Sequence, residues 1–382
     1  MTACDLRYCP RCVLPSTRPN LRFDDQGNCN CATREKKRAI DWTAREAQFR
    51  TLVATVKAQD RAYDCVIPVS GGKDSTWRAL KCLEYGLRPL AVTWRTPARN
   101  PLGQANLDNL IRLGLDHIDF SINPRVERVF TLAALERHGT PALPMHMALF
   151  AIPLRLALNY DIPLVVWGEN SAFEYGGDDE AVRGHRMSRD WLKKYGVTNG
   201  TTAEDWVGET LSLKDLTPYR WPSDAELAAK DVSAVFLGHY FEWDPVAVYE
   251  AVRGHGFQAM TGKPKTGYYA FADVDDDFLI TIHHWIKWYK FGFTRLWDNL
   301  SLEIRNGRLS RDEALRIIAE RGDERPDAEI DALCAYLGIA RERFFAILER
   351  FRNRDLWTQG PDGAWRIDGF LIPDWVWTNA PG

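Results

Sequence analysis

The sequence predicts an α/β fold in which a doubly wound parallel sheet carries helices on both faces. Two patterns carry this prediction. Uninterrupted apolar segments alternate with helix-like segments, and the first apolar segment runs straight into a glycine-containing turn. Uninterrupted apolar strands are typical of parallel sheets, because both faces of such sheets are buried. The turn should therefore lie at the carboxyl edge of the sheet, where such folds bind their ligands.

The expected strands and helices alternate along the first two thirds of the chain. We expect strands at residues 64–69, 89–94, 118–122, 162–167 and 232–237. We expect helices at residues 75–85, 103–113, 123–138 (with Asn123 as the cap) and 144–160. After residue 298 the pattern changes to charged amphipathic helices, beginning at the capping-box sequence Ser310–Glu313.

The turn after the first strand reads Ser70-Gly71-Gly72-Lys73-Asp74-Ser75 and predicts a phosphate-binding loop. Adjacent glycines let the backbone turn tightly and direct NH groups inward, while the following helix offers its positive end. The lysine and two hydroxyls add donors, so a polyphosphate is the expected ligand. The better-known P-loop pattern fails twice, because Ile67 occupies a required glycine position and Asp74 replaces a serine or threonine.

Composition limits the classes of binding partner and the cellular compartment that we expect for the protein. With 382 residues, 45% of them apolar, the chain has room for two or three domains. A net charge of −3 gives no electrostatic case for nucleic acid or a membrane surface as a partner. No apolar run is long enough to span a bilayer, and the first residues form neither a signal nor a transit peptide. We therefore expect a cytoplasmic protein.

Changes in composition divide the chain into four parts. We expect a cysteine-bearing, zinc-ribbon-like head at 1–35, a linker helix at 36–59, the nucleotide-binding α/β domain at 60–298 and a C-terminal helical region with a tail at 299–382. Residues 170–231 break the strand–helix alternation and predict an insertion over the site.

The cysteines concentrate in the head, where they predict a metal site. Five of the eight cysteines fall within the first 31 residues. A head this short has little hydrophobic core, so it needs a cross-link such as a bound metal to be stable. Cys9 and Cys12, followed by Cys29 and Cys31, can close two sides of a tetrahedral thiolate site for Zn²⁺. The second pair is closely spaced, so Cys4 is an alternative ligand, and unrelated cysteines are the competing interpretation.

Polar residues follow the fourth strand. Glu169 and Asn170 should face the same crevice as the phosphate loop, where Glu169 suits a Mg²⁺ ligand or a carboxylate that orients the substrate. A surface glutamate and a helix-capping asparagine are the alternative interpretation. Glu174, Tyr175 and two glycines follow at once, and the glycines would let the backbone approach a ligand.

Residues 282–295 combine cations with aromatic side chains. Helical spacing brings His284 and Lys287 to one side, and Lys290 and Arg295 follow further along the segment. Cations beside aromatic rings suit a phosphorylated sugar or a nucleic acid. The preceding acidic residues, Asp273 to Asp277, argue against a nucleic-acid stripe. A packed helix with snorkelling lysines is the competing interpretation.

Taken in order, several short motifs resemble one family. They are Cys9–Pro15, Arg18-Pro19, Phe23-Asp24, Cys29-Asn30, Ser70–Ser75, Gly168–Asn170, Glu174–Gly177, His283–Lys287 and Ile304–Gly307. This set resembles the bacterial N-acetyl sugar amidotransferases of the PP-loop ATP pyrophosphatase superfamily, over at least residues 8 to 320. Two features differ from the family pattern: the second cysteine pair is one residue shorter, and Thr294–Trp297 lacks the expected small residues.

The resemblance implies a fold, a reaction and roles for particular residues. The fold is the adenine nucleotide alpha-hydrolase-like PP-loop sheet. The reaction turns an acetamido group on a nucleotide-linked sugar into an acetamidino group, for surface polysaccharides such as the lipopolysaccharide O-antigen. ATP supplies the activation and leaves as AMP and pyrophosphate, since an amide oxygen departs readily only after adenylylation.

Site residues are assigned on this basis. The ATP-binding residues are Ser70, Gly71, Gly72, Lys73, Asp74 and Ser75, with Thr93 and Trp94 beside the adenine. The catalytic residues are Lys73, Asp74 and Glu169, with Mg²⁺ beside Asp74 or Glu169. The substrate-binding residues are Asn170, Glu174, Tyr175, His284, Lys287, Lys290 and Arg295.

Ammonia has no evident source within the chain. A glutaminase nucleophile needs an activated cysteine at a mature N-terminus or a tight strand-to-helix turn. Cys4, Cys65, Cys82 and Cys334 lack that setting, so we expect a separate glutaminase subunit. The resemblance implies one similar to the glutaminase of histidine biosynthesis.

Two other functions remain open at this point. A tRNA-modifying PP-loop enzyme, of the thiolase or lysidine synthetase type, would also adenylylate a carbonyl oxygen, but would need a basic RNA-binding module. A non-catalytic zinc-ribbon scaffold would bind ATP without forming AMP.

Overall fold

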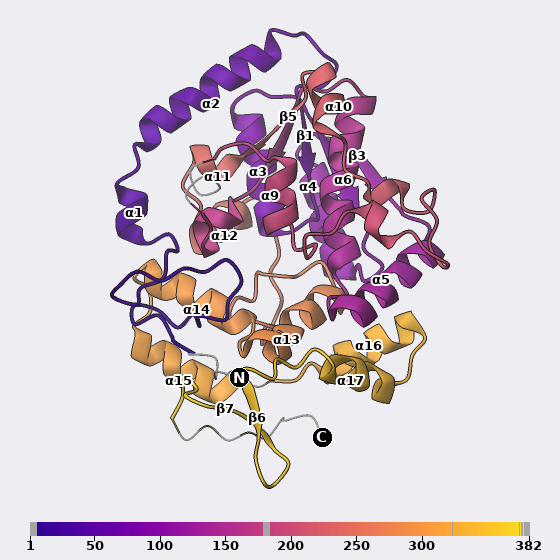
Figure 1. The fold of residues 1–382 in the computed structure, drawn as a ribbon. Helices are drawn as coiled ribbons and strands as arrows, with labels where there is room; N and C mark the ends of the chain where they lie inside the picture. Colours follow the sequence, from indigo (N-terminus) through magenta and orange to yellow (C-terminus); the bar gives the residue numbers. More distant parts are fainter. Residues whose placement is uncertain (1–5, 179–183, 323, 374, 376, 378–382) are drawn as a thin grey trace.

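The computed structural model describes residues 6–178, 184–322, 324–373, 375 and 377. Its centre is a five-stranded sheet in the order β3-β2-β1-β4-β5, and every neighbouring pair in it is parallel. The strands are β1 (Cys65–Pro68), β2 (Pro89–Trp94), β3 (Asp116–Phe120), β4 (Leu164–Trp167) and β5 (Ser233–Phe236). The predicted α/β class and parallel sheet are confirmed (Figure 1).

Alternate strand residues enter two different cores. Val66 and Val165 pair across β1 and β4 and join one core with the long apolar helix α6 (Leu143–Asn159) and α5 (Pro124–His138). Ile67 belongs to the other core, with α2 (Trp42–Lys57) and the helices named below. Because successive strand side chains point to opposite faces, the uninterrupted apolar pattern reflects burial on both sides.

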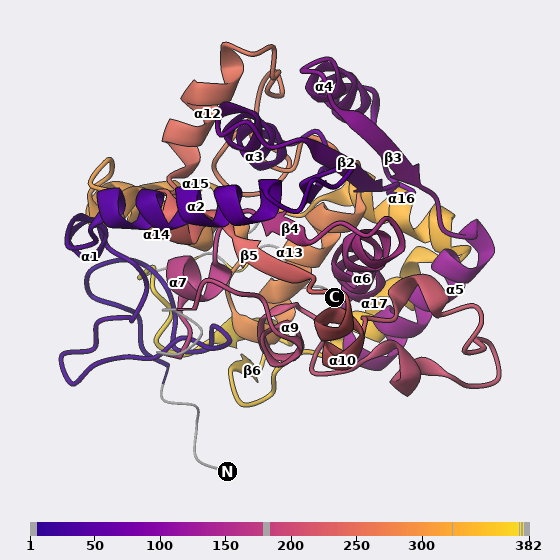
Figure 2. The same ribbon diagram turned by 90° about the horizontal axis from the view of Figure 1, so that it is seen from above.

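The second face of the sheet is covered by helices that follow β1, β2 and β5. They are α3 (Lys73–Glu84), α4 (Pro101–Ile111) and α12 (Pro245–Arg253), and Figure 2 shows α2 lying across this side. The helix expected at 75–85 begins two residues earlier, and the one expected at 103–113 begins at Pro101, because Asn100 caps it through the backbone NH of Gly103.

The expected linker helix at 36–59 is in fact two helices. Residues Arg34–Arg38 form α1, and α2 begins at Trp42. The break arises because the side chain of Asp41 accepts a hydrogen bond from Ala44 NH and so caps a new helix.

The expected insertion at 170–231 contains short elements and two 3₁₀ turns. They are α7 (Ser171–Tyr175), α9 (Arg189–Tyr195), Ala203–Trp206, Thr217–Tyr219 and α10 (Asp224–Ala229). α11 (Leu237–Tyr240) follows β5.

The C-terminal part packs below the sheet in Figure 1. It comprises α13 (Leu279–Phe291), α14 (Arg295–Arg305), α15 (Arg311–Arg321), α16 (Asp327–Leu337), α17 (Arg341–Glu349) and the antiparallel pair β6 (Trp357–Gln359) and β7 (Trp365–Ile367). The boundary expected at residue 298 falls inside α14, because the apolar face of that helix continues through Trp297 and Leu300.

The head shares its core with the C-terminal helices. Cys9, Cys12 and Leu14 are fully buried against Trp297 and Ile318. The head therefore folds onto the C-terminal region and has no separate core among the described residues. No helix in the described part of the chain is long and apolar enough to cross a bilayer.

Candidate active site

The site is built around the turn between β1 and α3, at the point where the strand order reverses. Gly71 has φ +91°, and a Cβ at this position would lie 2.8 Å from both the carbonyl oxygen of Gly103 and the backbone nitrogen of Leu107. The turn thus lies against α4 so closely that only glycine fits. This contact fixes the phosphate loop to the second helix of the sheet.

Hydroxyl groups brace the loop from inside. Ser75 Oγ accepts a hydrogen bond from Ser70 NH at 3.0 Å and lies 3.2 Å from Ser70 Oγ, which in turn accepts from Gly72 NH. Gly72 is the N-cap of α3 and supplies no side-chain cap. An uncapped helix N-terminus at the carboxyl edge of a parallel sheet is a favourable place for a phosphate group.

Lys73 and Asp74 form an ion pair at the start of α3. Lys73 Nζ lies 2.7 and 2.6 Å from the two carboxylate oxygens, and Trp243 Nε1 donates to Asp74 Oδ1 at 2.9 Å. Burial works against the ionised Asp74, but Lys73 and Trp243 outweigh it, so the pKa of Asp74 is lowered. The ammonium of Lys73 also faces the rings of Trp243 and Phe271 at 5.4 and 5.8 Å.

Glu169 follows β4 and faces the same region. Burial and the charge of Asp74 raise its pKa, against the nearby cations. A raised pKa makes a carboxylate a stronger proton acceptor.

Arg78 is a site residue that the sequence analysis missed. It is buried on α3, donates to the carbonyl oxygen of Pro68 at 2.6 Å and lies beside Gly168. Burial lowers its pKa, while Glu169 and Asp74 oppose that effect. Its spacing of four residues from Asp74 on one helix was a signal for it.

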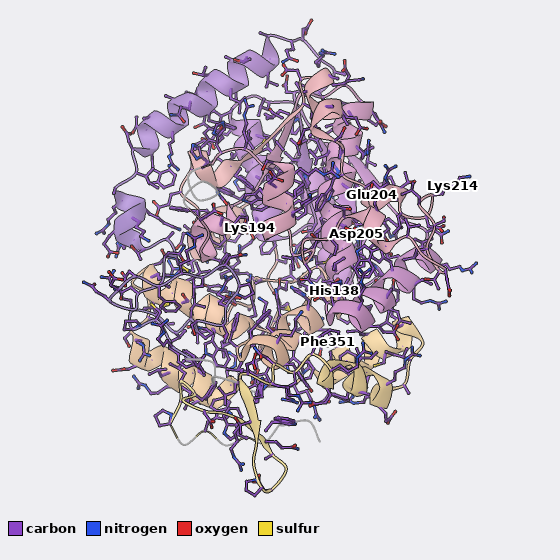
Figure 3. All side chains as sticks on the ribbon, in the orientation of Figure 1. His138, Lys194, Glu204, Asp205, Lys214 and Phe351 are labelled. Atoms are coloured by element: carbon purple, nitrogen blue, oxygen red, sulfur yellow. The ribbon has the colours of Figure 1, made fainter. Side chains whose placement is uncertain are left out.

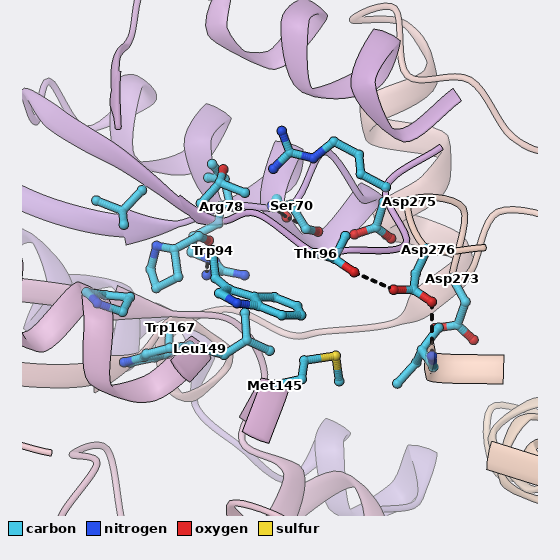
Figure 4. A pocket seen from close by; sticks show the side chains of 18 residues that line it. Ser70, Arg78, Trp94, Thr96, Met145, Leu149, Trp167, Asp273, Asp275 and Asp276 are labelled. Carbon is cyan, nitrogen blue, oxygen red and sulfur yellow. Dashed lines mark hydrogen bonds between the residues drawn. The ribbon is translucent and has the colours of Figure 1, made fainter. Parts of the chain in front are cut away.

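The acidic turn before α13 also reaches the site. A Cβ on Gly103 would lie 2.5 Å from Asp275 Cα, so this turn packs directly on α4. Asp276 accepts hydrogen bonds from Thr96 Oγ1 at 2.7 Å and from Ile280 NH at 3.0 Å (Figure 4). Burial raises the pKa of Asp275 to about 7, with Asp276 adding to it, and burial raises that of Asp276 to about 6.

A first cavity of about 280 Å³ lies beside the phosphate loop. It contains the predicted adenine neighbours Thr93 and Trp94, and Figure 4 shows Trp94 near Met145 and Leu149, with Ser70 and Asp275 across from them. One part of the wall is thus apolar and another polar, which suits a purine base joined to phosphates.

A second cavity of about 450 Å³ adjoins the first. Ser70, Ser75 and Arg78 line both. The predicted residues in this central cavity are Ser70, Gly72, Lys73, Asp74, Ser75, Glu169, Tyr175 and Arg295. The structure therefore brings the catalytic candidates together at one point.

Three predicted substrate residues lie elsewhere. Glu174 is buried in an ion pair with Lys37 at 2.9 Å, and burial raises its pKa to about 7. Asn170 caps α7 by accepting from Ala172 NH at 3.0 Å, which was the alternative interpretation given for it. His284 is buried with Nδ1 3.5 Å from Asp273. None of the three is among the residues that line these two cavities or the third cavity described below.

The head brings three of the four predicted thiols together. The sulfur atoms of Cys9, Cys12 and Cys29 all lie within 4.8 Å of one another, and Cys29 NH donates to Cys9 Sγ at 3.3 Å. Such thiolate spacing with a backbone NH to sulfur fits Zn²⁺. Cys31 is buried and hydrogen-bonds Cys29, but its sulfur lies outside that group. Cys4, the alternative ligand, lies outside the described residues.

The sheet order and the glycine loop at its switch point define a candidate phosphate-binding site at the carboxyl edge of a parallel α/β sheet. Residues 265–368 match the family model described as "LPS biosynthesis protein WbpG-like, C-terminal domain". The matched segment is the part of the chain that supplies Asp273 and Arg295 to the central cavity.

Solved structures align with the chain at low identity. NMN synthetase from Francisella tularensis is 15% identical, with a TM-score of 0.27, over 59% of this chain and 100% of that one. A predicted subunit of tRNA methyltransferase from Methanocaldococcus jannaschii is 14% identical, with a TM-score of 0.28, over 58% of this chain and 86% of that one. NAD+ synthetase from Burkholderia pseudomallei is 14% identical, with a TM-score of 0.25, over 61% of this chain and 97% of that one. No curated protein matches the chain.

Proposed function

We propose that this protein is an ATP-dependent, AMP-forming amidotransferase that converts the acetamido group of a nucleotide-linked N-acetyl sugar into an acetamidino group. The observation that carries the proposal is the junction of two cavities: one beside the phosphate loop and a larger one with charged groups of both signs. The WbpG-like segment, whose family description names lipopolysaccharide biosynthesis, forms part of both walls.

The proposed reaction has two steps that balance. The acetamido oxygen attacks the α-phosphorus of ATP, the bond from that phosphorus to the bridging oxygen breaks, and pyrophosphate leaves as the amide nitrogen loses its proton. Ammonia then attacks the imidate carbon, and AMP departs with the former amide oxygen. The new nitrogen keeps two of the three protons of ammonia and releases the third, and the amidine takes up a proton from solvent at neutral pH.

The residues of this chain have distinct parts in these steps. Lys73 and the NH groups at the start of α3 offset the charge that builds up on pyrophosphate. Arg78, between the two cavities, can offset the charge on the adenylyl group. Glu169, with its raised pKa, accepts the proton that ammonia releases.

Mg²⁺ fits the same place, because the carboxylates of Asp74 and Glu169 line the central cavity. When bound, the ion would neutralise phosphate charge. The raised pKa of Glu169 partly reflects the like charge of Asp74, which a cation would relieve.

We propose that ammonia comes from a separate glutaminase. Cys65 and Cys82 are completely buried in the sheet core and Cys334 is nearly so, which makes them poor nucleophiles. The purified chain should then use ammonium salts directly and show no activity with glutamine alone.

The test is a product assay with the purified chain. ATP, Mg²⁺ and ammonium are incubated with a panel of nucleotide-linked N-acetyl sugars and with tRNA. We expect AMP together with a sugar product in which one oxygen is replaced by NH, identified by mass spectrometry. Modification of the tRNA, or ATP binding without AMP formation under any condition, would contradict the proposal.

A further inference from the structure

A third cavity, of about 430 Å³, adjoins the central one on the side away from the phosphate loop. Tyr175 and Tyr195 line both cavities, whereas no residue of the phosphate loop lines the third. We call it the basic pocket, after the cations among its lining residues: Arg18, Lys193, Lys194, Lys287 and Lys290. They come from the head, α9 and α13.

The cations of the basic pocket outnumber their counter-ions in the described structure. No acidic side chain is among the described residues that line it. Asp298 lies 2.9 Å from Arg18 Nε and 3.0 Å from Lys287 Nζ, so one carboxylate serves two cations. Asp178 pairs with Lys194. The described lining of the pocket therefore keeps a net positive charge.

Lys290 is held in place by neutral partners. Its ammonium donates to the carbonyl oxygen of His138 at 2.9 Å and to Thr140 Oγ1 at 3.1 Å. Burial lowers its pKa to about 8, so the charged form still predominates at neutral pH. Lys290 is half-buried, and a partly desolvated ammonium that is held by neutral oxygens is a strong binding group for an anion.

Aromatic rings complete the lining. Phe291 and Phe293 lie near the lysine ammonium groups, at 5.7 Å from Lys290 and 5.8 Å from Lys287. Tyr175 has the Arg18 guanidinium 5.3 Å from its ring centre. Planar rings next to cations favour a base joined to phosphates, and the volume suits a small molecule.

We propose that the basic pocket binds the nucleoside diphosphate carrier of the acceptor sugar, while ATP occupies the cavity beside the phosphate loop. The inference rests on the proposed function, since it places the nucleotide-linked sugar of that reaction in the basic pocket and the adjoining central cavity. With the diphosphate among the lysines, the sugar passes between Tyr175 and Tyr195 into the central cavity. Two nucleotides thus bind at once, and Arg18 makes the cysteine head part of the acceptor site.

The test measures binding without turnover. The full chain is titrated calorimetrically with UDP and with CDP, alone and in the presence of a non-hydrolysable ATP analogue. We expect saturable binding of one of the two diphosphates without ATP, and little competition from the analogue. With the phosphate loop occupied by the ATP analogue, inorganic pyrophosphate should bind much more weakly than the diphosphate, because it lacks the base.

Two variants test whether the diphosphate binds in the basic pocket. Lys193→Glu reverses an exposed charge on α9, and Lys290→Gln removes a charge but keeps hydrogen-bonding capacity toward Thr140. Each should weaken diphosphate binding about tenfold, as expected for the loss of one charged contact. Lys214→Glu is the matched control, since Lys214 is exposed and lies at the right-hand edge of Figure 3, away from Lys194.

The outcomes separate this inference from the proposed function. Absence of UDP and CDP binding, full competition by the ATP analogue, equal affinity for pyrophosphate or unchanged affinity in both variants would overturn the basic-pocket assignment. If UDP or CDP binds as described but no acetamidino product forms, the pocket stands and the proposed function fails. If product forms with a KM that neither variant changes, the proposed function stands and the pocket assignment fails.

Discussion

Lys73 connects the phosphate loop with the proposed chemistry. Its ammonium is nearly buried, and both oxygens of Asp74 hold it within 2.7 Å. Lys73 also lines the central cavity, where pyrophosphate would depart. When ATP binds, the ammonium of Lys73 must therefore contact phosphate oxygens as well as Asp74. The hydrogen bond from Trp243 keeps Asp74 in position during this change.

Replacing Lys73 should remove catalysis without unfolding the protein. For Lys73→Ala we expect AMP formation to fall by about 10²-fold or more, the usual cost of losing a charge-stabilising group. Lys81→Ala is the control, because Lys81 is on the same helix but pairs with Glu84. AMP release is measured chromatographically, with circular dichroism to check folding. Unchanged release in Lys73→Ala would refute the role given to the loop.

Glu127 predicts a pH dependence of the free energy of unfolding. It is buried, burial raises its pKa to about 7, and Trp94 Nε1 donates a hydrogen bond to it at 2.8 Å. The folded state then binds the proton more tightly than the unfolded state, in which the pKa is near 4.5. The stabilisation is therefore fully present below that value and is lost as the pH rises through about 7.

The Glu127→Gln variant should therefore show a shallower pH dependence. Between pH values of about 5.5 and 8, the drop in the free energy of unfolding should shrink by about 2 kcal/mol. Urea denaturation at the two pH values measures this. Glu136→Gln, at a more exposed position of the same helix, should leave the slope unchanged. An identical slope in wild type and Glu127→Gln would show that Glu127 does not titrate as described.

At the scale of elements, alanine substitutions at two glycines with similar positive φ angles test how closely the turn between β1 and α3 packs on α4. Gly71 has φ +91° and touches the backbone of α4, whereas Gly114 has φ +101° and no described atom within 4 Å of where its Cβ would lie. Gly114→Ala should cost only left-handed strain, about 1 kcal/mol. Gly71→Ala adds a backbone clash and should cost about 3 kcal/mol and abolish ATP binding. Equal effects in thermal unfolding would contradict the close packing.

Local patterns predicted most of the elements but only part of the site. The strands and the loop at residues 70–75 depend on hydrophobicity and on glycines close together in sequence, so they could be predicted directly. The acidic turn at Asp275 could not, because its packing on Gly103 joins segments far apart along the chain. The position of Glu174 outside the three cavities could not be predicted for the same reason: its partner Lys37 comes from the helix after the head, and no spacing rule links the two.

At the scale of the whole molecule, the head serves as a wall of the proposed acceptor site. Arg18 donates to the carbonyl oxygen of Tyr175 at 2.8 Å and to Asp298. Asn30 donates to Gly177 at 2.8 Å, and Ala32 NH donates to Phe173. The segment after β4 is therefore held by the head, so any metal that orders the head also orders that segment.

Loss of the metal should loosen the head and the C-terminal helices together. We expect stoichiometric zinc in the wild type and reduced zinc in the Cys9→Ser/Cys12→Ser variant, with faster hydrogen exchange at residues 6–35 and in α14 and α15, because they share one core. The sheet should stay protected. Cys334→Ser, outside the head, should retain its zinc. Full retention in the double variant, or no zinc in the wild type, would contradict the metal site.

In the proposed reaction, the acetamido oxygen is adenylylated before ammonia displaces it. The most direct measurement uses a nucleotide-linked N-acetyl sugar labelled with oxygen-18 in its acetyl carbonyl, together with ATP, Mg²⁺ and ammonium. We predict that the label appears in the phosphate of AMP, in proportion to the acetamidino product. Label that enters pyrophosphate or water, or that remains in the sugar while AMP accumulates, would contradict adenylylation of the acetamido oxygen.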